Sequence, residues 1–317
     1  MRKRLMGIVK LIVIVVLGAL VPASLIAQQS VPDSTAAPRL PDGRPDLQGV
    51  WDFGSVTPLQ RPSTLADKEF LTEEDVSALE AQAAARVDRP PRPGDPGSYN
   101  RFWFADGTKV VGTRRTSLIV DPPDGRLPAY AAEGEARMAA REEARRRNAG
   151  PEDRDVDERC ILGFNSGPPM NPSAYNNNMQ LFQTGDHVVV LNEMVHDARI
   201  IPLDRSFHLP AAVHQWRGDS RGHWDGDTLV IETKNFTNQT SFRGSGPNML
   251  LIERFTRVAP DMLIYGYTVH DADSFARSWS VSVQMQKSDQ ALFEYACHEG
   301  NYGLLNMLRG ARSDDGK

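Results

Sequence analysis

The part of the chain after Cys160 is a succession of β-rich segments separated by short turn signals. Segments such as HVVVLN, DTLVIET and LLIERFTRV are rich in β-branched and aromatic residues. Asp-Gly-Asp at 225–227, Ala-Pro-Asp at 259–261 and Lys-Ser-Asp at 287–289 each separate two such segments at hairpin spacing. Consecutive hairpins tend to close on themselves, because an open sheet leaves unpaired edges. We therefore expect a mainly β fold, either an antiparallel β-barrel or a β-sandwich.

Two helices are expected to be inserted before these hairpins, at about 65–150. In the segment FLTEEDVSALEAQ, Thr72 has the character of an N-cap and Asp75 follows three residues later. The second helix is predicted over roughly 131–148, and its apolar positions are nearly all alanine, which favours a place on the surface of the domain. We interpret its basic run AREEARRR at 140–147, interleaved with glutamates, as a solvated helix face.

The first residues of the chain predict export. A basic start, MRKR, precedes the apolar run LIVIVVLGALVPASLIA, which is typical of a signal peptide over 1–27. Pro22 and the short apolar run argue against a stable membrane span after cleavage, although an uncleaved anchor is the alternative. We expect a periplasmic or secreted protein with a disordered lead-in at 28–45 and a single β-rich domain at 46–317.

Export also determines how the two cysteines are interpreted. Cys160 and Cys297 are the only cysteines in the chain. In an oxidising compartment an even and minimal set favours one disulfide, while two buried free thiols are the alternative. The net charge of −5 argues against nucleic acid as a partner, because no basic stripe dominates the sequence.

Several long motifs resemble a family of exported bacterial proteins of unassigned function: PDGRPDLQGVWDF, RRTSLIVDPPDGR, HDARIIPLD, GHWDGDTLVIET and YACHEGNYG. The resemblance covers nearly the whole mature chain and implies export and a single repeated architecture, but no reaction. Separately, Gly49-Val50-Trp51 is similar to the G-x-W opening of lipocalins, which implies a closed barrel that holds a small ligand.

The segment NEMVHDAR carries the most concentrated acid–base chemistry. We predict that it forms one strand, with Glu193, Asp197 and Arg199 on one face and His196 on the other. An internal ion pair between a carboxylate and Arg199 is one interpretation, because unpaired charges inside a barrel are costly. In the other interpretation His196 is a general base and Arg199 binds a substrate anion or carbonyl.

The segment EYACHEG is expected to be the last strand, with His298 and Glu299 at its end, where they meet VHDAR at a barrel mouth. Two interpretations remain open. In one, His196, Asp197, His298 and Glu299 hold a divalent metal, since histidine and carboxylate ligands suit zinc and similar ions. In the other, His298 forms a structural hydrogen bond in a closing turn.

Two functional classes follow. The first is an enzyme of hydrolase or lyase type that acts on a carbohydrate or a small aromatic compound by histidine–carboxylate chemistry. The second is a non-catalytic, lipocalin-like protein that binds a small molecule. Tyrosine, tryptophan and amide side chains in loops favour sugar contact, and no oligomeric state is predicted. The candidate catalytic residues are His196, Asp197, His298 and Glu299, and the candidate substrate-binding residues are Arg115, Arg199, Glu193, Tyr99, Trp103 and Asn176.

Overall fold

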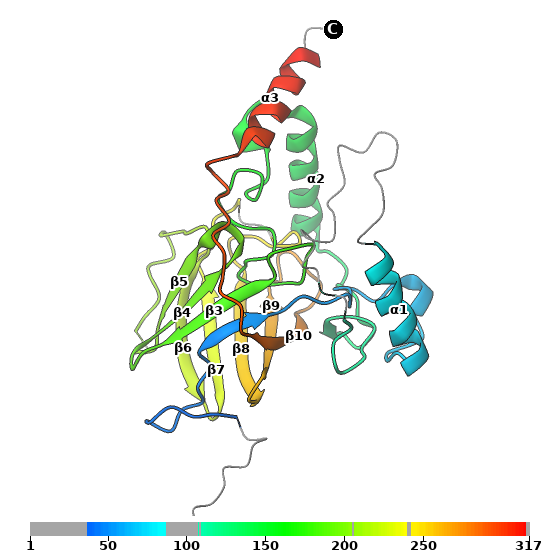
Figure 1. Cartoon of the computed structure of the whole chain (residues 1–317). Helices are drawn as coiled ribbons and strands as arrows, with labels where there is room; N and C mark the ends of the chain where they lie inside the picture. The colour runs from blue at the N-terminus through cyan, green and yellow to red at the C-terminus, as the bar shows by residue number, and fades with distance from the viewer. Residues whose placement is uncertain (1–36, 87–106, 108, 205, 240–241, 315–317) are drawn as a thin grey trace, which may run out of the picture. The chain divides into compact units, whose positions relative to one another are not determined.

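The computed structural model describes residues 37–86, 107, 109–204, 206–239 and 242–314. Within this part, ten strands form one antiparallel sheet, and three α-helices accompany it (Figure 1). The mainly β class predicted from the hairpin signals is therefore confirmed. The predicted signal peptide at 1–27 lies outside the described residues, as do Tyr99 and Trp103.

The elements follow one another in this order: β1 (Gly49–Asp52), α1 (Glu73–Arg86), β2 (Ile119–Asp121), α2 (Ala132–Arg147), β3 (Asn178–Gln183), β4 (His187–Asn192), β5 (Ala198–Pro202), β6 (Asp219–Asp225), β7 (Thr228–Lys234), β8 (Leu250–Ala259), β9 (Met262–His270), β10 (Trp279–Ser288) and α3 (Tyr302–Asp314). Short 3-10 turns occur at Ser63–Leu65, Pro151–Asp153 and Met194–His196.

The sheet has the order β5-β4-β3-β1-β10-β9-β8-β7-β6, and β2 pairs with β10 outside this path. Its two end strands approach each other (Figure 1). A Cβ on Gly222 of β6 would lie 2.7 Å from the Leu203 side chain, just after β5, so a larger residue would not fit this close approach. Among the described residues, β5 and β6 share no ladder. The sheet thus curls into a barrel that closes by packing.

The interior of the barrel is filled by side chains. Strands β8, β9 and β10 alternate buried and less buried residues along their length, as expected where one face of a sheet covers a core. The largest fully buried side chains include Trp51, Trp279, Tyr265, Tyr267 and Phe255. These rings occupy the space that a lipocalin-like cup would leave for a ligand.

The turn signals have different outcomes. Asp225 pairs with Thr228, and Ala259 pairs with Met262, so the hairpins predicted at 225–227 and 259–261 are confirmed. The hairpin predicted at 287–289 is wrong, because β10 ends at Ser288 and no strand follows it in the described chain. The segment that carries His298 and Glu299 is consequently a turn rather than a strand.

The two inserted helices are present, and a third was not predicted. Thr72 accepts a hydrogen bond from the Asp75 N–H (3.2 Å), and Asp75 accepts one from the Thr72 N–H (2.7 Å), which forms a capping box at the start of α1. The insertion also contains β2, so it is not wholly helical. The additional helix, α3, begins beside Asn301, whose side-chain oxygen accepts a hydrogen bond from the Leu304 N–H at 3.1 Å.

The prediction that NEMVHDAR forms one strand is wrong. β4 ends at Asn192 and β5 begins at Ala198. Between them the backbone turns, with left-handed conformations at Val195 (φ 64°) and His196 (φ 43°). The buried side chain of Val195 compensates for a conformation that a β-branched residue rarely adopts. A hairpin turn therefore replaces the expected alternation of faces.

The predicted disulfide between Cys160 and Cys297 is present, with the Cα atoms 5.6 Å apart. It joins the segment before β3 to the segment before α3. In the described part of the chain, no helix is both long enough and apolar enough to span a membrane.

Candidate functional site

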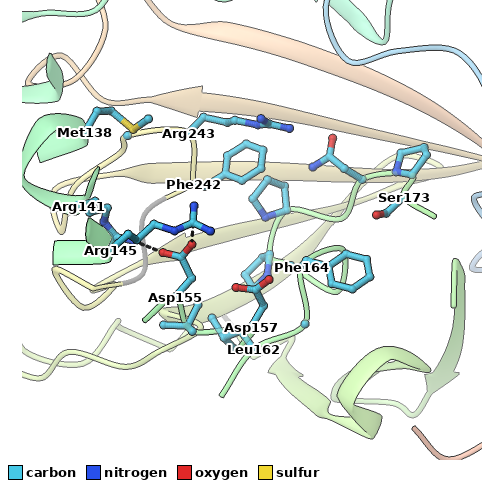
Figure 2. A pocket seen from close by; sticks show the side chains of 18 of the residues that line it. Met138, Arg141, Arg145, Asp155, Asp157, Leu162, Phe164, Ser173, Phe242 and Arg243 are labelled. Atoms are coloured by element: carbon cyan, nitrogen blue, oxygen red, sulfur yellow. Dashed lines mark ion pairs between the residues drawn. The ribbon is translucent and has the colours of Figure 1, made fainter. Parts of the chain in front are cut away.

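The largest cavity that we describe is a cleft of about 640 Å³, which we call the α2 cleft (Figure 2). It lies between α2, the segment 155–173 and the turn at 242–244. Its volume is in the range of small-molecule sites. The residues that line it are Met138, Arg141, Glu142, Arg145, Asp155, Val156, Asp157, Leu162, Gly163, Phe164, Gly167, Pro168, Pro169, Asn171, Pro172, Ser173, Phe242, Arg243 and Gly244.

One wall of the cleft is made by α2. Arg141 and Arg145 are four residues apart and therefore project from one face of the helix. Their guanidinium groups lie 4.0 Å and 3.2 Å from the Asp155 carboxylate, and Figure 2 marks both ion pairs. The interpretation of 140–147 as a solvated face agrees with Arg145, whose side chain is 48% exposed, whereas Arg141 is half-buried beside Asp155 at the cleft.

The floor of the cleft is anchored on the barrel. Phe242 stacks on Trp279 with 5.8 Å between ring centroids, and its ring meets that of Tyr267 edge to face at 6.0 Å. The Tyr267 hydroxyl donates a hydrogen bond to the Asn171 side-chain oxygen at 2.8 Å. Burial raises the pKa of Tyr267 above its usual range, so this hydroxyl acts as a donor. The barrel core thereby fixes both Asn171 and Phe242 in the cleft.

Asp157 has the most distinctive electrostatic environment in the cleft. Burial raises the pKa of its carboxyl group above the usual range, and the negative charge of nearby Asp155 adds to this effect. No arginine or lysine of the described chain pairs with Asp157, whereas Asp155 pairs with two arginines. The cleft therefore holds two neighbouring carboxyl groups in contrasting surroundings, which is the arrangement found where an acid and a base have separate roles.

A second cavity of about 160 Å³ adjoins the first, and Asp157, Gly163 and Phe164 line both. Its far side is aromatic. The Phe164 and Tyr175 rings meet edge to face at 5.3 Å, and the Tyr175 and Tyr295 rings are 6.3 Å apart. We call these three residues the aromatic row. Phe164 is 44% exposed, so part of its ring surface is open beside both cavities.

The disulfide positions one end of the aromatic row, because Tyr295 is two residues from Cys297. The Asn301 side chain reinforces this attachment by donating to the Glu158 carbonyl oxygen at 2.9 Å and to the Cys160 sulfur at 3.3 Å. Thus the C-terminal segment is held against the segment that carries Asp157.

The VHDAR and YACHEG segments do meet, but through residues other than those expected. A ring nitrogen of His196 lies 3.0 Å from the Tyr295 carbonyl oxygen, and the Phe293 N–H donates to Glu193 at 3.3 Å. Glu193 also accepts a hydrogen bond from the Asn178 side chain at 2.7 Å. His298 and Glu299 are exposed in the turn before α3. Within the described residues, neither side chain forms a hydrogen bond or an ion pair with His196, and the predicted four-residue cluster is not assembled there.

Three other candidates form ion pairs outside the cleft. Asp197 pairs with Arg217. Burial lowers the pKa of Arg217 to about 10. Arg199 is buried inside the barrel, where it pairs with Glu253, and this agrees with the internal ion-pair interpretation although the partner differs from the ones expected. Arg115 pairs with Glu69 at 2.9 Å and lies over the Phe70 ring.

The remaining candidates are placed as follows. Asn176 adopts a left-handed conformation (φ 53°), and its carbonyl oxygen accepts a hydrogen bond from Asn165 at 3.1 Å. Tyr99 and Trp103 lie outside the described residues. Among the residues that the structure describes, no group of three or more histidine, cysteine, aspartate or glutamate side chains is placed to hold a metal ion. The His196, Asp197, His298 and Glu299 set therefore offers no ready divalent-metal site.

Sequence reasoning missed the residues that define the cleft. Arg141 and Arg145 were visible as an i, i+4 pair, and Asp155 and Asp157 alternate in the segment DRDVDERC just before the cysteine. Nothing local in the sequence links these residues to Phe242 and Arg243, which follow β7. The contact between α2 and this turn forms only in the tertiary structure.

In comparisons with known proteins, no protein-family model matches the chain, and no curated protein matches it.

Proposed function

We propose that the protein is an exported enzyme that acts on a carbohydrate in the α2 cleft, with Asp157 as the general acid. The main support for this proposal is the Asp157 carboxyl group, which is half-buried between the α2 cleft and the aromatic row. Burial raises the pKa of this group. A carboxyl group of this kind remains protonated at higher pH than an exposed one, which suits it to donate a proton in a reaction near neutral pH.

The proposed reaction begins with the proton on the Asp157 carboxyl group. Asp157 donates it to the glycosidic oxygen as the bond from that oxygen to carbon breaks, so the leaving sugar departs as a neutral alcohol. Hydrolysis and elimination share this step. In hydrolysis a water molecule then adds to the sugar carbon and loses a proton, and in elimination the sugar ring itself loses a proton from carbon. Asp155, kept near two guanidinium groups, is the neighbouring carboxylate available to accept a proton.

The lining of the cleft suits a sugar. Exposed Phe164 offers an apolar ring face on which a sugar ring stacks, and Asn171 and Ser173 offer amide and hydroxyl groups for sugar hydroxyls. A binding role in the barrel lumen has less support, because aromatic side chains fill the interior. The long disulfide-closed loop and the resemblance to exported bacterial proteins support a periplasmic or secreted location.

The proposal is tested by incubating the mature, oxidised protein with a panel of neutral and acidic polysaccharides. New reducing ends report hydrolysis, and the ultraviolet absorbance of an unsaturated sugar reports elimination. With any substrate that is cleaved, Asp157→Asn should lower turnover by about 10²-fold or more, which is the usual contribution of a general acid. Activity of the wild type should also fall at high pH as Asp157 ionises.

The control is Asp289→Asn, which changes an exposed aspartate after β10, outside the cleft. It should leave turnover unchanged. Equal turnover by Asp157→Asn and Asp289→Asn would contradict the assignment of Asp157 as the acid, and cleavage of no member of the panel would count against an enzyme acting on carbohydrate.

A further inference from the structure

One arginine of the α2 cleft differs from the other two. Arg243 lies in the turn after β7, beside Phe242, and its side chain is exposed at the cleft (Figure 2). Its backbone is left-handed, with φ 55°, a conformation that costs a residue with a Cβ free energy. Strain of this kind is a reason to look for a function at the residue that carries it.

The turn that presents Arg243 is fixed in place. Arg137 of α2 donates from the same nitrogen to the Gly244 carbonyl oxygen and to the Ser274 hydroxyl, both at 2.7 Å. Gly244 is itself left-handed (φ 91°), and a Cβ there would lie 3.1 Å from both the Met138 and Tyr130 side chains. The helix therefore holds the turn closely, so the left-handed backbone of Arg243 is imposed by its surroundings.

No acidic side chain in the described part of the chain pairs with Arg243. Arg141 and Arg145 pair with Asp155, but within the described residues Arg243 makes no ion pair and no side-chain hydrogen bond. Its positive charge acts on the Tyr267 hydroxyl, where it opposes the rise in pKa that burial causes. The guanidinium group is therefore near the Asn171–Tyr267 floor of the cleft and free to bind a ligand.

The charges of the lining indicate what that ligand carries. Three arginines face three acids, namely Glu142, Asp155 and Asp157. When Asp157 is protonated for its role as an acid, one positive charge is in excess. A single carboxylate balances this charge and matches the planar fork of a guanidinium group. A phosphate dianion would instead bring two negative charges, one more than this excess balances.

We propose that Arg243 binds the carboxylate of an acidic sugar, so that the substrate class is a uronate-containing oligosaccharide. This inference rests on the proposed function and names its substrate. Arg243 is a specificity-determining residue: it orients the uronate in the cleft while Asp157 meets the glycosidic oxygen.

The test is calorimetric titration of the oxidised protein with trigalacturonate and with its neutral methyl ester. The key variant is Arg243→Asn, because asparagine tolerates the left-handed backbone and removes only the guanidinium group. Arg126→Asn, at an exposed arginine outside the cleft, is the matched control. Arg243→Asn should weaken trigalacturonate binding by about 10- to 100-fold, the range for a hydrogen bond to a charged group. Arg126→Asn and the methyl ester of the ligand complete the comparison.

The inference predicts that the wild type prefers trigalacturonate to its methyl ester, that Arg243→Asn abolishes this preference, and that Arg126→Asn keeps it. Equal affinity of Arg243→Asn and wild type for trigalacturonate, or no binding of trigalacturonate by the wild type, would overturn it. Stronger, Arg243-dependent binding of a sulfated trisaccharide would also overturn the choice of carboxylate. The proposed function is tested separately by Asp157→Asn, which should bind trigalacturonate but not turn it over.

Discussion

At the residue scale, the buried Arg199–Glu253 pair shows how the barrel accommodates charge. Arg199 donates to Glu253 through both terminal nitrogens, the second at 2.9 Å, and the Tyr265 hydroxyl donates to the same carboxylate at 2.8 Å. Both charged side chains are nearly inaccessible to solvent. These polar side chains are therefore tolerated in the interior only because they supply one another's hydrogen-bond and ionic partners.

This network predicts a specific response to substitution. Arg199→Met should lower the free energy of unfolding by about 3–5 kcal/mol, because it leaves a carboxylate buried without a cation. The double variant Arg199→Met, Glu253→Met should recover much of that loss, since neither charge remains. Urea denaturation measures both. Arg254→Met, which breaks the exposed pair with Asp225, is the control and should cost about 0–1 kcal/mol. A double variant that is as unstable as the single one would contradict this account.

Asp157 predicts a pH-dependent effect on stability. Its pKa is raised in the folded protein, so ionisation favours the unfolded chain. This penalty is absent at a pH below the ordinary carboxyl range and complete at a pH above the raised pKa. Asp157→Asn should therefore be more stable than the wild type at neutral pH and equal to it in acid. The midpoints of urea denaturation at neutral and acidic pH test this prediction, and Asp289→Asn is the control. An Asp157→Asn protein that is less stable than the wild type at neutral pH would disprove it.

At the scale of elements, several local signals were predicted correctly, but the hairpin at 287–289 and the strand over NEMVHDAR were not, and tertiary contacts were missed. The capping box at Thr72 and the tight turn at 225–227 depend on neighbours in the sequence, and both were predicted. α3 was missed because Gly303 and Gly310 weaken its helical pattern, while its anchoring depends on Asn301 and the disulfide. The α2 cleft was missed for the same kind of reason, since its walls come from distant segments.

The cap of α1 gives a test at this scale. Thr72→Ala should lower the free energy of unfolding by about 0.5–2 kcal/mol, because the Asp75 N–H loses its acceptor. Thr72→Ser keeps the hydroxyl oxygen and should be close to the wild type. Thermal or urea denaturation of the three proteins provides the comparison. Equal stability of Thr72→Ala and Thr72→Ser would show that the cap contributes nothing measurable.

At the scale of the whole molecule, the disulfide connects the β-barrel's C-terminal segment to the cleft. Cys160 and Cys297 are 137 residues apart, for which the chain-entropy model gives a stabilisation of about 5 kcal/mol as an upper figure. The cross-link also holds Tyr295 in the aromatic row. Stability and ligand binding are thus expected to depend on the same bond.

The double variant Cys160→Ser, Cys297→Ser should therefore be less stable in urea and bind trigalacturonate more weakly than the oxidised wild type. Wild type measured with a reductant should behave like the variant, and the variant should not respond to the reductant. A variant that matches the oxidised protein in both properties would show that the cross-link neither stabilises the fold nor shapes the site.

We propose that this protein binds its ligand in the α2 cleft. Hydrogen–deuterium exchange of the oxidised chain, with and without trigalacturonate, tests it most directly because it locates binding without assuming a reaction. If the α2 cleft binds the ligand, exchange should slow in α2, in 155–173 and around the 242–244 turn when the ligand is present. Protection confined to other segments, such as the β4–β5 turn, or no protection at all would contradict it.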